Sequence, residues 1–221
     1  MFSAEKDRDA ESFYAKTLTY LVFLGVFMGL GISALAREAV LLLDPKYQEA
    51  WKVIPLLCIA QILDGLPPAL SPGLLLKRQT LLLPIAHAAG LLVSLILGAW
   101  LIWYLKLGLL GTSITFIASF LVICIVRVIN SQKFLKIPWE WFRILKVFLV
   151  ASVLYTLTLF LSFPSIWLSI VVKLLVCLTF PLLLWVVRFY EPAELKRFGM
   201  LFSRALQTLG LRSPSPPPPE P

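Results

Sequence analysis

The sequence predicts an all-α fold, a polytopic bundle of about six transmembrane helices. Six long apolar stretches separated by short polar joints fill nearly all of the chain between Thr17 and Tyr190. Hydrophobic residues make up 59% of the 221 residues and charged residues only 14%, with a mean hydropathy of +0.88, which leaves no polar surface for a soluble domain. Polar and apolar residues do not alternate along the stretches, so helices are predicted rather than strands.

Each apolar stretch is close to the ~20 residues that a helix needs to cross a bilayer. The predicted spans are Leu18–Ala36, Val53–Leu76, Leu81–Leu105, Leu109–Ile129, Val147–Phe163 and Ile166–Val187. They lie in a bundle at residues 17–190. A mixed acidic and basic leader at residues 1–16 precedes it without a cleavage pattern, so the first stretch is a span and not a signal peptide. An amphipathic segment at 191–212 and an unstructured proline-rich tail at 213–221 follow; the tail is alternatively a ligand for a proline-binding module.

The first span carries Gly25, Gly29 and Ser33 at four-residue spacing, which predicts close packing of another helix. Arg37 and Glu38 are expected to interrupt this element before Asp44-Pro45 ends it. The second stretch is predicted to kink or break, and the carbonyls freed by the break need partners in protein or in a water-lined cavity. Its helix-breaking residues are Pro55, Gly65, Pro67, Pro68, Pro72 and Gly73.

The later spans carry fewer signals. Small residues recur from Gly108 to Ser119 and predict a packing face on the fourth span. The longest joint, residues 130–146, mixes Trp139 and Trp141 with lysines and arginines, which predicts an amphipathic segment at the membrane interface. Cys58, Cys124 and Cys177 fall within spans without metal or disulfide spacing, so they are expected to pack as small apolar residues.

Basic residues are distributed unevenly over the joints. By the positive-inside rule both termini are cytoplasmic, and an even number of spans agrees. The net charge of +8 is then explained by topology and anionic headgroups, and nucleic acid is not expected as a partner. The predicted inner face carries Lys6, Arg8, Lys16, Lys77, Arg78, Arg127, Lys133, Lys136, Arg143, Lys146, Arg188, Lys196, Arg197, Arg204 and Arg212, and the outer face only Arg37, Lys46, Lys52 and Lys106.

Ionisable residues inside spans are costly and so are candidates for function. Asp64, on the same helix as Gln61, could carry a proton or sodium ion or meet a cationic partner; alternatively it forms a packing pair with a lysine or arginine. Lys173 either extends to the outer interface or faces a cavity and attracts a phosphate. His87 is either a packed or interfacial side chain or part of a transport path. No catalytic or dinucleotide motif occurs, so neither an enzyme, a cofactor nor a metal site is expected.

Three short motifs follow one another between Leu41 and Lys136. The apolar run from Leu41 leads to Tyr47 and, three residues on, Ala50; the interrupted second stretch ends in Lys77-Arg78-Gln79-Thr80; and Gly108-Leu-Leu-Gly111-Thr112-Ser113 begins the fourth span. Their order and spacing resemble the polysaccharide, or lipid-linked oligosaccharide, flippases of the multidrug and oligosaccharidyl-lipid/polysaccharide exporter superfamily. Thr112 and Ser113 stand where the family has alanines, and the asparagine of its third span is absent, with Ser94 nearest.

Members of this family are about twice as long and MATE-like, with two pseudo-symmetric lobes, and this chain resembles the C-terminal lobe. The resemblance implies a transporter of the cell membrane that flips polyprenyl-linked oligosaccharide between leaflets by alternating access, for polysaccharide biosynthesis. It implies that Gln61, Asp64, His87 and Lys173 face the cavity, and that Lys77 and Arg78 form a cytoplasmic gate or headgroup anchor. The implied partners are membrane lipid, the lipid-linked oligosaccharide, and a missing N-terminal bundle or a second copy of the chain.

Three alternatives stay open. A related branch exports drugs in exchange for cations, which requires an acidic ion site, and Asp64 is the candidate. The chain could instead be a non-transporting membrane scaffold in a polysaccharide-assembly complex. An integral-membrane transferase is weaker, because paired acids are lacking.

Overall fold

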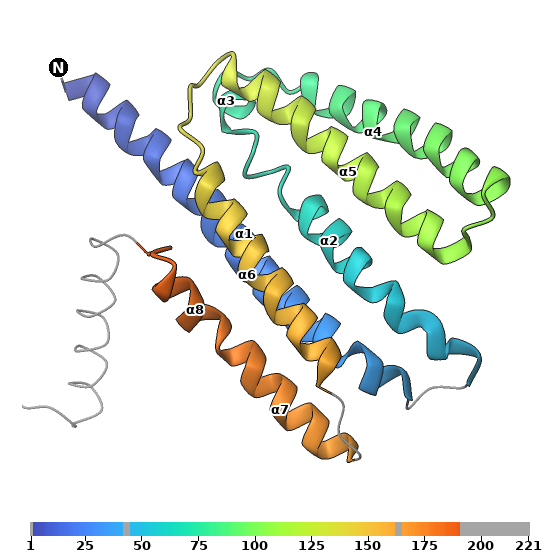
Figure 1. Ribbon diagram of the computed structural model, residues 1–221. Helices are drawn as coiled ribbons and strands as arrows, with labels where there is room; N and C mark the ends of the chain where they lie inside the picture. Colours follow the sequence, from blue (N-terminus) through green and yellow to red (C-terminus); the bar gives the residue numbers. More distant parts are fainter. Residues whose placement is uncertain (1, 42–44, 162–164, 191–221) are drawn as a thin grey trace, which may run out of the picture. The chain divides into compact units, whose positions relative to one another are not determined.

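The computed structural model describes residues 2–41, 45–161 and 165–190, and most of these are helical, with no strand among them (Figure 1). The all-α prediction is confirmed. The chain divides into two compact units, Met1–Phe180 and Pro181–Pro221. The predicted segment at 191–212 and tail at 213–221 lie outside the described residues.

Helix α1 (Phe2–Leu41) is a single continuous helix that packs against α2 (Ile54–Gly65), α6 (Trp141–Phe160) and α7 (Ile166–Leu178). The expected interruption at Arg37 and Glu38 is wrong, because the helix runs through both residues to Leu41. The predicted packing face is confirmed: Gly25 lies against Ile62 of α2, and Gly29 lies against Cys58 and Ile62. Aromatic packing ties α1 to the end of the same unit, with Phe23 and Phe27 stacked on Phe180 at centroid distances of 5.7 and 5.8 Å.

A 3-10 helix, η1 (Pro45–Lys52), leads into the second apolar stretch, which breaks as predicted. Helix α2 ends at Gly65, and the short helix α3 (Pro72–Leu76) begins after an irregular turn that contains Pro67 and Pro68. Prolines lack the N–H group that the helical ladder needs, so two in succession stop the helix.

Helices α4 (Leu82–Gly98) and α5 (Gly108–Gln132) form a hairpin, in which α4 continues as a π-helical turn, η2 (Ala99–Tyr104). The predicted small-residue face of α5 is confirmed, because Gly98 lies against Thr115 and Gly90 against Ser119 and Ile123. The Ser119 hydroxyl donates to the Gly90 carbonyl at 2.8 Å. Small residues on both helices therefore bring their backbones close together.

The joint from α5 to α6, residues 133–140, is a turn followed by an extended segment, and its Lys133 and Lys136 are exposed. Alternate side chains of an extended segment point the same way, and Ile137 and Trp139 are buried. They pack with Ala15 and Leu18 of α1 and with other residues of the same cluster. The extended joint thus fastens α6 to the first half of α1.

Helices α7 and α8 (Phe180–Val186) complete the described chain. Among the described residues, five helical segments are long and apolar enough to cross a membrane: Ala10–Leu41, Leu82–Tyr104, Gly108–Gln132, Trp141–Phe160 and Ile166–Val186. The remaining predicted span, Val53–Leu76, is the second along the chain, and it corresponds to the broken pair α2 and α3. The chain is therefore a multi-pass membrane protein.

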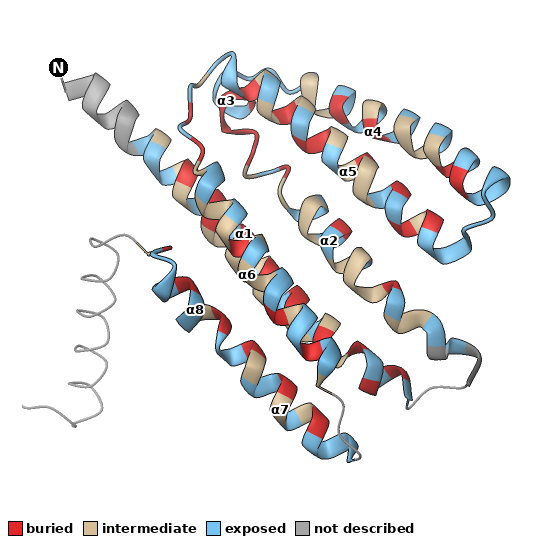
Figure 2. Ribbon diagram, viewed as in Figure 1, coloured by how far each residue is buried: buried red, intermediate tan, exposed pale blue. Residues whose placement is uncertain are grey.

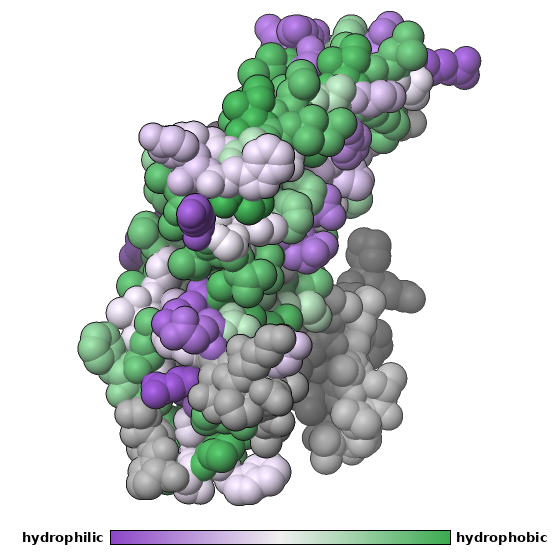
Figure 3. Space-filling view, turned by 90° about the vertical axis from the view of Figure 1, so that its right-hand side faces the viewer, coloured by the Kyte–Doolittle hydropathy of each residue, from purple (hydrophilic) through white to green (hydrophobic). Residues whose placement is uncertain are grey.

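The surface agrees with a lipid environment. Figure 2 shows that each long helix of the larger unit carries exposed positions along much of its length, and large apolar side chains occupy many of them. On the face drawn in Figure 3 apolar residues predominate, and strongly hydrophilic ones lie at its upper end and at separate places further down. In water such a surface would drive aggregation, whereas hydrocarbon chains solvate it.

Candidate functional site

Gln61 and Asp64 lie three residues apart on α2, and both are exposed on the outside of the larger unit. Neither side chain makes a hydrogen bond or ion pair with another described residue. Gln61 lines a groove of about 360 Å³ between α1 and α2, whose other walls are apolar residues such as Leu24, Met28 and Ile32. The sequence places Asp64 on a broken helix correctly, but the carboxylate is exposed and not buried.

A second apolar groove, of about 490 Å³, continues along α1 toward its N-terminal half. Its walls come from α1, from the turn after α2 and from α3, and include Phe13, Pro68 and Leu76. The two grooves share Leu21, so together they follow one face of α1 past the break in the second apolar stretch. A long apolar chain fits this surface better than a compact polar molecule does, because the walls offer few hydrogen-bonding groups.

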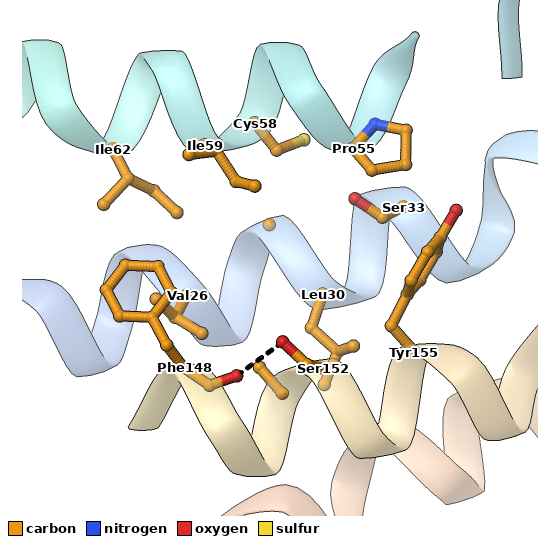
Figure 4. Close-up of a pocket in the computed structure, with 12 residues that line it drawn as sticks. Val26, Leu30, Ser33, Pro55, Cys58, Ile59, Ile62, Phe148, Ser152 and Tyr155 are labelled. Atoms are coloured by element: carbon orange, nitrogen blue, oxygen red, sulfur yellow. Dashed lines mark hydrogen bonds between the residues drawn. The ribbon is translucent and has the colours of Figure 1, made fainter. Parts of the chain in front are cut away.

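On the other side of the α1–α2 contact, a smaller cleft of about 110 Å³ separates α2 from α6 (Figure 4). Val26 and Leu30 of α1 line it together with Ile62 of α2. Ser33 and Tyr155 bring hydroxyl groups to the end near Pro55. Ser152 of α6 also lines the cleft, but its hydroxyl donates to the Phe148 carbonyl of its own helix at 2.8 Å.

Helix α5 supplies the partners for the broken backbone between α2 and α3. The Cys124 thiol donates to the Leu63 carbonyl at 3.3 Å, and the Gly73 N–H donates to the Ser131 hydroxyl at 3.1 Å. Within the turn, the Ser71 hydroxyl donates to the Pro67 carbonyl at 2.6 Å. The prediction that the freed carbonyls find partners in protein is confirmed for Leu63 and Pro67.

Arg127 of α5 lies at the same break and is only 7% exposed. Its guanidinium donates to the Ser71 hydroxyl at 3.0 Å, and its second terminal nitrogen lies 2.8 Å from His87 Nε2. No carboxylate pairs with it within the described part of the chain. Of the alternatives for His87, the structure gives an exposed side chain on α4 that contacts a buried arginine.

Lys173 of α7 is 4% exposed, and its side chain does not extend to the interface. Its ammonium donates to Glu38 Oε1 of α1 at 2.5 Å, and the Ser169 hydroxyl donates to the same oxygen at 2.6 Å. Glu38 is itself 6% exposed. The structure thus joins Lys173 to an acid 135 residues away in the sequence.

Lys77 and Arg78 lie in the joint between α3 and α4, and both are exposed. Arg78 has a φ of 54°, the left-handed conformation that a tight reversal of the chain uses. In Figure 1 this joint lies at the same end of the larger unit as the end of α5 and the start of α6. Lys133 and Lys136, both exposed, follow α5 at that end, and Lys106 lies in the α4–α5 joint at the opposite end.

The predicted site residues do not form one cluster. The structure gives instead a polar face on α2 with Gln61 and Asp64, a cluster of Arg127, His87 and Ser71, and the separate ion pair of Glu38 and Lys173. No group of three or more His, Cys, Asp or Glu side chains that could hold a metal ion occurs among the residues described. Sequence reasoning missed Glu38 and Arg127, although a charged residue near the end of a long apolar run is the signal that marks both.

Comparison with known proteins found no match: no protein-family model, no curated protein and no solved structure matches this chain.

Proposed function

We propose that the chain is one lobe of a membrane transporter that flips a polyprenyl-linked oligosaccharide between leaflets of the cell membrane. The supporting observation is the exposed polar face of α2 that carries Gln61 and Asp64. With a rise of ~1.5 Å per residue, Asp64 lies about 15 Å along the axis from Ile54, which is about half of the ~30 Å hydrocarbon core. A carboxylate at that depth needs a water-filled cavity or a covering partner.

The surroundings of this face suit a lipid-linked substrate. The two grooves along α1 are apolar and offer a track for a polyprenyl chain, while Gln61 and Asp64 offer polar contacts to a sugar. The basic joints with Lys77, Arg78 and Lys133 supply cations for a diphosphate at the end that the positive-inside rule makes cytoplasmic. In this proposal Asp64 and Gln61 bind sugar hydroxyls, and Lys77 and Arg78 hold the headgroup before it moves.

One lobe leaves this face open to lipid, so the proposal includes a second wall. A second copy of the chain, or a separate bundle that resembles the N-terminal lobe, would cover the α2 face and enclose Asp64. For the isolated chain we expect a dimer in mild detergent, measured by light scattering behind a sizing column.

The test uses purified chain in vesicles that contain a fluorescent polyprenyl diphosphate oligosaccharide, with dithionite added outside to bleach the probe exposed there. We expect the protected half to be bleached as it is flipped, while a fluorescent phosphatidylcholine stays protected. Asp64→Asn is expected to slow flipping at least about tenfold, the loss expected for a charged hydrogen bond. Glu49→Gln, which changes an exposed acid on η1, is the matched control and should flip at the original rate.

Absence of flipping by the chain would contradict the proposal, and equal flipping by Asp64→Asn would contradict the role of Asp64. A parallel arm loads the same vesicles with a fluorescent cationic drug under a proton or sodium gradient. Gradient-driven drug movement without lipid flipping would favour the antiporter alternative. Movement of neither probe would favour the scaffold.

A further inference from the structure

Arg127 is a buried cation whose hydrogen-bond partners among the described residues are all neutral. It lies on α5 and is 7% exposed. One terminal nitrogen donates to the Ser71 hydroxyl at 3.0 Å, and the other lies 2.8 Å from His87 Nε2. Its Nε is buried and has no acceptor among the residues described. A guanidinium stays charged in proteins, and a charge in a low-dielectric interior is costly unless a counter-charge accompanies it.

The elements around α5 supply no such counter-charge. Its main packing partners are α2, α3, α4 and η2. Of these, α3, α4 and η2 carry no acidic residue, and the acid of α2, Asp64, is exposed and pairs with no described residue. Glu140, the next acid after α5, accepts hydrogen bonds from Thr19 and Arg143. Exposed cations at the same end of the larger unit are Lys77, Arg78, Lys133 and Lys136 (Figure 1).

The Arg127 side chain does not extend to the end of its helix, as the side chain of an interfacial arginine does. The residue lies five positions before Gln132, where α5 ends, which is ~8 Å along the axis at ~1.5 Å per residue. Its guanidinium contacts Ser71, which is 1% exposed and lies in the turn between α2 and α3. A neutral donor would satisfy that hydroxyl, so the bond to Ser71 does not explain the charge.

His87 connects the buried guanidinium with the lipid-facing surface of α4. A guanidinium only donates hydrogen bonds, so Nε2 of His87 accepts and Nδ1 carries the ring proton. The side chain is exposed, and Nδ1 has no acceptor among the residues described. His87 therefore offers an unpaired N–H donor, and the arginine behind it holds the ring in place and polarises this donor.

Apolar side chains continue from His87 along one face of α4. Leu91 and Leu95 follow at intervals of four residues, which places all three on the same face, and they are 59% and 61% exposed. His87 lies five positions after Leu82, where α4 begins, or ~8 Å from the basic joint. A donor near the level of the headgroups, followed inward by an apolar stripe, matches a phospholipid with its phosphate at the donor and an acyl chain along the stripe.

We propose that His87 and Arg127 bind the phosphate of an anionic phospholipid from the leaflet at the basic end of the larger unit. The group recognised is a phosphate oxyanion. His87 Nδ1 donates to a phosphate oxygen, and Arg127 is a positioning residue that orients the imidazole and supplies the positive charge. Phosphatidylglycerol fits better than phosphatidylcholine, because the choline cation already balances the phosphate.

This inference does not rest on the proposed function, because the ligand is a bulk membrane lipid and its binding is measured without transport. The experiment is a lipid competition on the full chain, measured by native mass spectrometry. Phosphatidylglycerol and phosphatidylcholine with identical acyl chains are supplied together at equal concentration. We expect the parent to retain one phosphatidylglycerol with an about tenfold preference, the size expected for charged hydrogen bonds. A second arm adds inorganic phosphate, which should not displace the lipid because it lacks acyl chains.

Four variants locate the preference. Arg127→Gln keeps a donor for Ser71 and removes the charge, whereas His87→Leu removes the exposed donor; each should lower the preference to about threefold or less. His87→Asn keeps an amide N–H near the position of Nδ1 and should preserve more of the preference than His87→Leu does. Lys136→Gln is the matched control, because it removes an exposed cation at the same end, and it should bind as the parent does.

Equal binding of the two lipids by the parent would overturn the proposal. A preference that persists in His87→Leu, or that falls as far in Lys136→Gln, would assign it to the general charge of the basic joints and also overturn the site. Displacement of the lipid by inorganic phosphate would show an oxyanion site that does not select phospholipid. Because His87→Leu changes an exposed residue, the comparison holds even if Arg127→Gln fails to fold.

Discussion

At Gly73 the backbone of α3 lies directly against the backbone of α5. A Cβ added there would overlap the Ser131 carbonyl oxygen, because it would lie closer than non-bonded atoms approach a Cβ in real structures. It would also lie 2.9 Å from the Ser131 hydroxyl oxygen. The Gly73 N–H also donates to that hydroxyl. Glycine is needed at this position because any side chain would prevent the close approach of the two backbones.

Gly73→Ala is therefore expected to destabilise the fold by ~1–3 kcal/mol, the range for inserting a methyl group into a filled contact. The matched control is Gly31→Ala on α1, because an added Cβ there meets nothing within 4 Å. The control should be neutral or more stable by at most ~1 kcal/mol, since alanine favours a helix. Unfolding by SDS in mixed micelles measures both, and equal stability of the two variants would contradict the close approach.

The residue scale also shows where sequence reasoning stops. Prolines and glycines predict the break after Gly65, because their effects are local. The same pattern does not say which side chains satisfy the broken backbone, since Cys124 and Ser131 come from a helix about 60 residues further on and meet it only in the fold. Glu38 and Lys173 illustrate this as well: each looks like an interruption in its own span, and only their contact makes them a pair.

At the scale of elements, the α4–α5 hairpin is held by small residues on both helices. An added Cβ at Gly90 would lie 2.6 Å from Ile123 Cγ1 and 3.1 Å from the Ser119 carbonyl oxygen. The small-residue face of α5 is predictable from its spacing, but its matching glycines on α4 are not, because the register of two helices is set by their packing.

Gly90→Ala is expected to lower the stability of the hairpin by ~1–3 kcal/mol, because Ile123 must move. Ile123→Ala removes the two carbon atoms nearest to the added Cβ, and by itself leaves a cavity. Combined, the two substitutions should destabilise less than the sum of the separate effects, by ~1 kcal/mol or more. Strict additivity in SDS unfolding would contradict the contact between these residues.

The extended joint before α6 is an element whose partners the sequence does not predict. Tryptophans among basic residues predict an amphipathic segment, and in the structure Trp139 is 8% exposed and packs in the cluster with Ala15 and Leu18. The basic residues of the joint stay outside while alternate side chains turn inward. A period of two over so few residues is too short to be recognised before the fold is known.

At the scale of the whole molecule, the arrangement of the helices shows at which end of the larger unit the basic joints lie. In the larger unit the exposed Lys77, Arg78 and Lys133 lie at one end, and Lys106 lies in the joint at the other. The crossings of α4 and α5 set these ends on opposite sides, and the broken pair α2 and α3 has to count as one crossing for the start of α1 to lie on the same side as Lys77 and Arg78. Hydropathy thus predicts the number of crossings. The prolines predict which crossing is broken, namely the one formed by α2 and α3.

Single cysteines placed at Lys133 and at Lys106, in a background without native cysteines, test this orientation. In intact cells a membrane-impermeant maleimide is expected to label position 106 and to label position 133 only after permeabilisation, because the positive-inside rule predicts that the basic end faces the cytoplasm. Labelling of both positions from outside would mean that α5 does not cross the membrane. Labelling of 133 alone from outside would reverse the orientation.

The hydrogen bonds from α5 to the break also constrain the order in which the segments of the chain enter the membrane. The Gly73 N–H emerges from the ribosome well before Ser131 exists to accept its hydrogen bond. Hydrocarbon offers this group no substitute partner. We therefore expect the segment of α2 and α3 to wait at the translocon or the membrane surface during synthesis, and to enter the bilayer together with the finished α4–α5 hairpin.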